Sequence, residues 1–131
     1  MSEKLRLHVD EALEPAAASA VYLEQILRNL LSNADKYSPP DEPIELTACQ
    51  DGSGDIIISV RDHGPGIGPQ ELELIFERFY RSDRTAKQAG GAGIGLTVCK
   101  RLIEAQGGRI WAGTPEGGGL EVSFSLPAYK E

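Results

Sequence analysis

The segment IELTACQDGSGDIIISV, residues Ile44–Val60, decides the fold class of this sequence. Ile44–Cys49 alternates apolar and polar residues, which predicts a strand, and Asp55–Val60 is rich in Ile and Val, which predicts a buried one. The turn-forming cluster Asp51–Gly54 lies between them. We therefore expect the two strands to pair directly as a β-hairpin.

The pattern on either side of this hairpin predicts an α+β domain. Further strands are expected at Leu5–Asp10, Arg109–Ala112 and Leu120–Leu126, and helices at Ala20–Tyr37, Pro69–Phe76 and Gly95–Gln106. A doubly wound parallel sheet needs a helix between each pair of strands, and that alternation is missing. We expect an α/β sandwich in which helices pack on one face of a mixed, mostly antiparallel sheet.

Composition limits the class of protein. The chain has 131 residues, of which 40% are hydrophobic, enough for one domain over residues 1–131 with its own core. The net charge of −7 and the absence of a Lys/Arg run argue against a nucleic-acid partner. No apolar run is long enough to span a bilayer, and no signal peptide is recognisable. We expect a cytoplasmic domain without direct membrane contact.

The cysteines and histidines do not predict a metal centre. Cys49 and Cys99 lie in apolar, periodic segments, so we expect two buried free thiols in a reducing compartment. Together with His8 and His63 they show no recognisable metal-ligand spacing.

The first predicted helix carries an unusual polar stripe. Asn29, Asn33 and Lys36 recur at spacings of four and three residues, which places them close together beside the apolar face. Asn is a poor residue for a helix interior. Amide oxygens can ligate a hard cation such as Mg²⁺, and a nearby Lys can meet a phosphate. The alternative is a solvated face on which the two Asn are incidental.

Two glycine-rich segments are candidates for ligand contact. Asp62–Gly68 follows a predicted buried strand, and its Asp can accept a hydrogen bond from an exocyclic amine such as adenine N6; the alternative is an ordinary turn. Gly90–Thr97 leads into a helix, whose free amides and dipole attract phosphate. It fits neither a Walker A motif nor the G-x-G-x-x-G dinucleotide frame. The alternative is a hinge or a crowded packing site.

Four segments together resemble the conserved boxes of sensor histidine kinases. Asn29–Pro39 resembles the N box, Asp62–Ile67 the G1 box, Ile75–Arg81 the F box and Gly91–Leu96 the G2 box. Each segment alone is a weak signal, but their order and spacing match, and the resemblance covers about residues 5–127. It implies the Bergerat ATP-binding fold, an α/β sandwich shared with DNA gyrase and mismatch-repair ATPases.

The resemblance assigns roles to individual residues. It implies that Asn29, Lys36 and Arg81 are catalytic and that Asn33 holds Mg²⁺. The residues implied to bind ATP are Asn29, Asn33, Lys36, Tyr37, Asp62, Gly64, Gly66, Ile67, Gly91, Gly93, Ile94, Gly95 and Leu96. Lys36 and Arg81 would meet the phosphates, Tyr37 would flank the nucleotide, and Asp62 would accept from the adenine amine. Residues 82–91 would form the lid over the ATP.

The resemblance also implies a partner domain. In these kinases the γ-phosphoryl group goes to a histidine of a separate dimerisation and phosphoacceptor domain, and from there to a response regulator. His8 lies in a predicted strand and His63 in the adenine loop, so neither has that context. We expect a monomeric catalytic domain of a two-component system, cut from a parent that is either soluble or membrane-anchored. No autophosphorylation is expected in isolation.

Three alternatives stay open at this point. A gyrase-like ATPase carries a Glu general base at the position of Asn29, and an amide cannot take a proton. A Ser/Thr-directed kinase of the same fold is disfavoured by Tyr37 and by the Phe-Tyr-Arg segment that ends at Arg81. A non-catalytic module that senses nucleotide or binds a partner would usually have lost box residues, and none is lost here.

Overall fold

The computed structural model describes residues 5–9, 20–39, 41–76 and 95–128. The strands are β1 (Leu5–Val9), β2 (Ile44–Gln50), β3 (Ile56–Arg61), β4 (Arg109–Gly113) and β5 (Glu121–Leu126). The helices are α1 (Ala20–Tyr37) and α3 (Gly95–Ala105), and two short 3₁₀ turns are η1 (Pro69–Glu71) and η2 (Leu74–Phe76). The predicted Pro69–Phe76 helix is therefore two separate turns. At its start, the N–H of Glu71 donates to the carbonyl oxygen of Gly68, and the N–H of Leu72 donates to that of Pro69, which is the hydrogen-bond spacing of a 3₁₀ helix.

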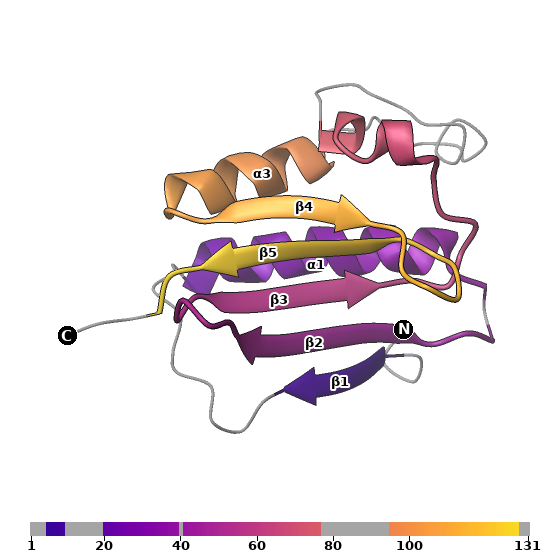
Figure 1. The fold of residues 1–131 in the computed structure, drawn as a ribbon, viewed down its shortest axis with the longest axis horizontal. Coiled ribbons are helices and arrows are strands. Elements are labelled where there is room, and N and C mark those ends of the chain that lie inside the picture. The colour runs from indigo at the N-terminus through magenta and orange to yellow at the C-terminus, as the bar shows by residue number, and fades with distance from the viewer. Residues whose placement is uncertain (1–4, 10–19, 40, 77–94, 129–131) are drawn as a thin grey trace.

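The strands form one mixed sheet in the order β1-β2-β3-β5-β4 (Figure 1). β1 lies parallel to β2, and the other three pairings are antiparallel. The predicted hairpin is confirmed as β2 and β3, with Ala48 opposite Ile58. The carboxylate of Asp51 accepts hydrogen bonds from the backbone N–H groups of Ser53 and Asp55, which closes its turn.

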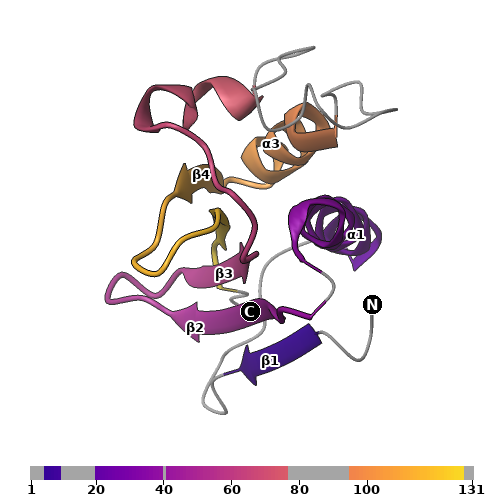
Figure 2. The same ribbon diagram turned by 90° about the vertical axis from the view of Figure 1, so that its right-hand side faces the viewer.

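Both helices cover the same face of the sheet, as predicted (Figure 2). α1 packs against β2, β3 and α3 and buries Ile26, Leu30 and Ala34 completely or nearly so. Alternate strand residues meet this helix layer and complete the core: Ile44, Ala48, Ile56, Ile58, Val60, Val122, Phe124 and Leu126. Among the described segments, no helix combines the length and the apolarity that crossing a bilayer requires.

One expectation about burial is wrong. Cys99 is buried, but Cys49 is exposed, because it pairs with Ile57 on the face of the sheet away from the helices. Strand β1 forms where predicted, yet Leu7 and Val9 remain 61% and 54% exposed. β1 is an edge strand beyond the part of the sheet against which α1 packs. Alternation along a strand reports which residues share a face, whereas burial depends on what covers that face.

Candidate functional site

The chain segments singled out from the sequence gather at one end of the sheet. The C-terminal end of α1, the loop after β3, the turn η2 and the N-terminal end of α3 all lie at this end (Figure 1). The end of β3 lies beside the start of β5, because the two strands are antiparallel with Arg61 opposite Glu121.

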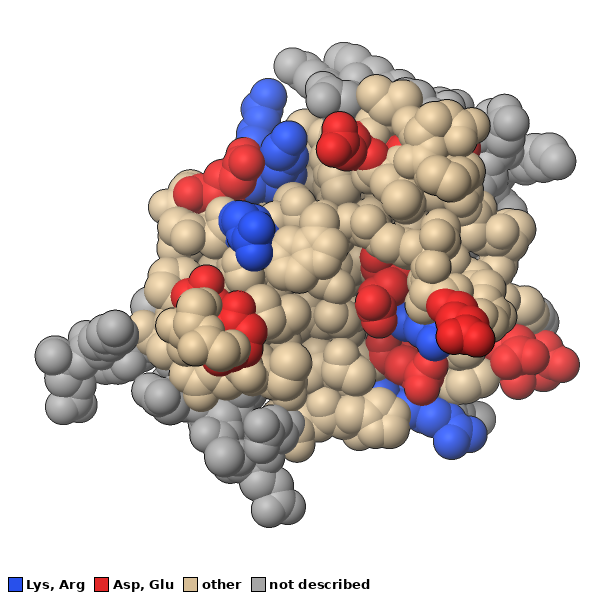
Figure 3. All heavy atoms as spheres, in the orientation of Figure 1, with Lys and Arg blue, Asp and Glu red and all other residues tan. Residues whose placement is uncertain are grey.

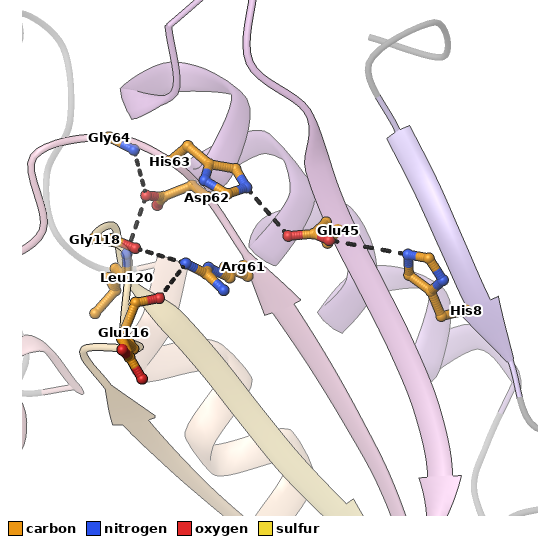
Figure 4. Close-up of polar contacts among 9 residues, drawn as sticks. All are labelled: His8, Glu45, Arg61, Asp62, His63, Gly64, Glu116, Gly118 and Leu120. Carbon is orange, nitrogen blue, oxygen red and sulfur yellow. Dashed lines mark hydrogen bonds and ion pairs between the residues drawn. The ribbon is translucent and has the colours of Figure 1, made fainter.

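Asp62 is a buried carboxylate at the centre of this end. It is 2% exposed, and its Oδ1 accepts the backbone N–H of Gly64 at 2.9 Å and of Leu120 at 3.2 Å (Figure 4). Its own N–H donates to the Leu120 carbonyl at 3.0 Å. A buried carboxylate is tolerated only when hydrogen-bond donors replace water. Here backbone amides do so, and they fix the orientation of the side chain.

The turn between β4 and β5 packs directly beneath the Asp62 loop. Gly119 has φ +87°, and a Cβ there would collide with the Asp62 carbonyl oxygen. Gly66 has φ +71°, and a Cβ there would lie 3.0 Å from the Gly119 carbonyl oxygen. These two glycines are required by close backbone approach as well as by their conformation.

Arg61 ties the same turn to the end of β3. Its Nη2 donates to the carbonyl oxygens of Glu116 at 2.8 Å and Gly118 at 3.2 Å (Figure 4). Sequence reasoning missed Arg61, Gly119 and Leu120 as supports of the site. The glycine run Gly117–Gly119 predicts a turn between two strands, but no local pattern indicates which loop that turn packs against.

One residue of the polar stripe of α1, Asn29, lies beside the second helix. Asn29 and Asn33 are half-buried, and Asn29 lies near the Cys99 thiol of α3, which donates to the carbonyl oxygen of Ile26 at 3.8 Å. Burial raises the pKa of Cys99 to about 11, and the nearby Asn29 side chain opposes that shift. Asn29 is therefore held between the helices rather than solvated on a free face. Lys36 and Tyr37 lie in the last turn of α1, and their side chains are outside the described part of the structure.

The N-terminal end of α3 is anchored to η2. Thr97 Oγ1 donates to the carbonyl oxygen of Phe76 at 2.9 Å, and Thr97 is buried. Gly95 is the first residue of α3, and Leu96 packs against the core as does Ile67 from the Asp62 loop. Four predicted site residues and the predicted lid at 82–91 lie outside the described residues: Arg81, Gly91, Gly93 and Ile94.

The described residues contain no cluster of three or more His, Cys, Asp or Glu side chains that could hold a metal ion. A magnesium site can instead use one amide oxygen together with water and phosphate oxygens. Asn29 and Asn33 on α1 are half-buried amide side chains of that kind.

Comparison with known proteins settles the family. The profile described as histidine kinase-, DNA gyrase B- and HSP90-like ATPase matches residues 18–130. The chain belongs to this ATPase family. Similar members include the sensor histidine kinase WalK of Bacillus subtilis, 40% identical over 83% of the chain and 18% of WalK. The sensory kinase SasA of Synechococcus elongatus is 42% identical over 82% of the chain and 28% of SasA.

Solved structures in this ATPase family confirm the fold. The mycobacterial sensor histidine kinase MprB superimposes with a TM-score of 0.84 at 28% identity, over 98% of the chain and 87% of the MprB chain. Full-length ShkA in complex with AMPPNP gives 0.83 at 34% identity, over 98% of the chain and 26% of ShkA. The resemblance to histidine kinase catalytic domains and the fold class are thus both confirmed. The chain spans 18% and 28% of the lengths of WalK and SasA.

Proposed function

We propose that this domain binds Mg-ATP and transfers the γ-phosphoryl group to a histidine on a separate dimerisation and phosphoacceptor domain of a sensor kinase. The observation that carries the proposal is the buried Asp62, held by the backbone N–H groups of Gly64 and Leu120. A carboxylate oriented in this way is suited to accept a hydrogen bond from the adenine amine.

The phosphate side of the proposed site lies between α1 and α3. The N-terminal amides of α3 offer hydrogen bonds and the positive end of the helix dipole, which favour an anion. Asn29 and Asn33 supply amide oxygens on the facing side of α1, and we assign Asn33 to Mg²⁺ with Asn29 beside it. Bound Mg²⁺ would neutralise charge on the phosphates. Lys36, Arg81 and the glycines at 91, 93 and 95 are assigned to the phosphates by the family resemblance.

The proposed reaction requires this domain mainly to position the γ-phosphoryl group of ATP. A neutral imidazole is already a nucleophile, so no strong base is needed to activate it. The domain has to hold the γ-phosphoryl group in line with the incoming imidazole and stabilise its charge. Asn29 suits this task, because an amide cannot take a proton from water and so does not promote wasteful hydrolysis.

Size and sequence support a partner domain in the same parent protein. The relatives are several times longer than this chain, and neither His8 nor His63 has the helical context of a phosphoacceptor. We assign the phosphoacceptor histidine to another domain of the parent kinase, and the next phosphotransfer to its response regulator. We assign the domain itself to the cytoplasm, as a monomer.

The deciding experiment mixes the domain with γ-labelled ATP and with histidine-bearing helical domains from sensor kinases. We expect the label to appear on the helical domain as an acid-labile phosphoramidate and to stay absent from the catalytic domain alone. ATP binding without transfer to any of these domains would favour the non-catalytic module. Rapid phosphate release without transfer would favour the gyrase-like ATPase.

A further inference from the structure

The turn between β4 and β5 contains three consecutive glycines in the left-handed region of backbone conformation. Gly117, Gly118 and Gly119 have φ angles of +96°, +98° and +87°. Glycine loses more conformational freedom on folding than any other residue, so a run of this kind has little intrinsic preference for one shape. One backbone hydrogen bond lies inside the turn, from the Gly118 N–H to the Pro115 carbonyl oxygen at 3.1 Å. Contacts from outside the turn are therefore important for its conformation.

Arg61 supplies such a contact from the end of β3. Its Nη2 donates to two carbonyl oxygens of the turn, that of Glu116 at 2.8 Å and that of Gly118 at 3.2 Å (Figure 4). A Cβ on Gly117 would lie 3.1 Å from the same nitrogen, so the guanidinium group lies directly against the glycine run. Hydrogen bonds from a charged donor are stronger than those from a neutral one. One side chain thus fixes the positions of two carbonyl groups of the turn.

The turn continues directly into Leu120, which contacts Asp62 twice. The Leu120 N–H donates to Asp62 Oδ1 at 3.2 Å, and the Leu120 carbonyl oxygen accepts the Asp62 N–H at 3.0 Å. Gly119 lies so close to the Asp62 carbonyl oxygen that a Cβ there would collide with it. On the other side of the loop, His63 Nε2 is 3.1 Å from the Glu45 carboxylate, a contact that does not involve the turn (Figure 4). A shift of the turn would therefore displace a hydrogen-bond donor of the Asp62 carboxylate.

We propose that Arg61 is a positioning residue for adenine recognition, which acts through the β4–β5 turn to hold the Leu120 N–H against Asp62. This inference rests on the proposed function of Asp62. A binding group that is already held in its working orientation raises affinity, because the cost of ordering it is met before the ligand arrives. The effect is expected for the base of the nucleotide and not for its phosphates, which are assigned to α1 and α3.

The first measurement is the hydrogen exchange rate of the Leu120 amide, which needs no nucleotide. In Arg61→Ala we expect this amide to exchange about tenfold faster than in the wild type, because loss of the Arg61 bonds makes local opening of the turn easier. The Phe124 amide, in the middle of β5, should keep its rate.

Arg109→Ala is the matched control for both measurements. Arg109 lies on the same face of the sheet as Arg61, but at the end of β4 that is remote from the turn. Its guanidinium group lies over the ring of Trp111, 5.2 Å from the ring centroid. Arg109→Ala should therefore leave both the Leu120 exchange rate and nucleotide affinity at their wild-type values.

The second measurement compares the dissociation constants of ADP and inorganic tripolyphosphate by calorimetry, at a temperature where circular dichroism shows every variant folded. Arg61→Ala is expected to weaken ADP by about threefold to tenfold, the value of one hydrogen bond, and to leave tripolyphosphate unchanged. Arg61→Lys keeps a charged donor and should recover most of the affinity for ADP. Glu121→Gln removes the charge opposite Arg61 in the sheet and should bind ADP as the wild type does.

Each outcome decides the inference. An unchanged Leu120 exchange rate or an unchanged ADP affinity in Arg61→Ala would overturn it and leave the proposed function intact. An equal loss for ADP and tripolyphosphate would also overturn it, since Arg61 would then support the whole domain. If Arg61→Ala does not fold, Arg61→Met, which keeps an unbranched stem and lacks a donor, takes its place with the same expected results. A wild-type domain that binds neither ADP nor ATP overturns the proposed function and this role with it.

Discussion

The two sides of the candidate site are built by different means. On the proposed adenine side, Asp62 is oriented by backbone amides of Gly64 and Leu120, and Leu120 lies 58 residues away in the chain. On the proposed phosphate side, Asn29 and Asn33 belong to an amphipathic helix, beside the face that packs into the core. The adenine side thus depends on the exact approach of two loops, and the phosphate side on the packing of two helices.

This difference indicates how each side fails. A loop held by main-chain contacts has few side chains to truncate, so its weak points are the glycines that permit close approach. A helical stripe tolerates substitutions of its exposed neighbours, so its weak points are the functional side chains themselves.

Figure 3 adds that charged side chains lie toward the margins of the uncovered sheet face, with a largely uncharged centre.

The largest effect is expected from Gly119→Ala, with Gly118→Ala as its matched control. Both glycines have positive φ, +87° and +98°, but a Cβ on Gly118 meets nothing within 4 Å, whereas one on Gly119 collides with Asp62. The control should cost about 1–2 kcal/mol of unfolding free energy from backbone strain alone. Gly119→Ala should cost more than about 3 kcal/mol and also weaken adenine binding. Equal losses for the two variants in urea unfolding would contradict the close approach.

Asp62→Asn is expected to weaken ATP and ADP by roughly 10- to 100-fold, because a charged hydrogen-bond acceptor at the base is replaced by a neutral one. Inorganic tripolyphosphate, which lacks the base, should keep its affinity. Calorimetry with both ligands measures the difference. An equal loss for tripolyphosphate would argue that Asp62 supports the fold rather than the base.

Asn33→Ala is expected to reduce the Mg²⁺-dependent part of ATP affinity by about tenfold, since an amide ligand is lost. Ser32→Ala, at the adjacent exposed position of α1, is the control and should bind as the wild type does. Titrations with Mg²⁺ and with EDTA separate the metal-dependent part. Unchanged affinity and phosphotransfer in Asn33→Ala would remove Asn33 from the site.

The smallest effect concerns the two thiols. Cys49 is exposed and Cys99 is buried against Asn29, with a pKa raised from 9.0 to about 11. Iodoacetamide attacks the thiolate, so at pH 8 the native domain should be labelled at one site and the unfolded domain at both. Cys49→Ser should show no labelling in the native state. Fast labelling of Cys99 in that variant would mean that the α1–α3 contact opens readily.

The same pKa predicts a loss of stability in alkaline solution. Below pH 9 the Cys99 thiol is protonated in both the folded and the unfolded state, so it adds no pH dependence there. Between pH 9 and about 11 the unfolded state ionises first, and the stability falls as pH rises. Urea unfolding at pH 8 and pH 10.5 should show a smaller drop for Cys99→Ala than for the wild type.

Several features of the molecule could be predicted from local patterns. The hairpin Ile44–Val60, the helix Ala20–Tyr37 and the coverage of one sheet face followed from periodicity and from the order of the elements, and all are confirmed. The family followed from four short motifs in order, and is confirmed by the match over residues 18–130. Periodicity failed for Cys49, because alternation alone does not say which face the helices cover.

The sequence by itself determined most of the elements, the fold class and the family, because periodicity and short motifs are properties of single segments. Only the tertiary structure decided what holds Asp62 in place. Its partners Gly119 and Leu120 belong to a turn that meets the loop through antiparallel pairing of β3 with β5. The contact of His63 with Glu45 has the same origin, since the loop after β3 lies beside β2 only in the folded sheet. Contacts between segments distant in sequence leave no period in either segment, so they appear only when the chain is folded.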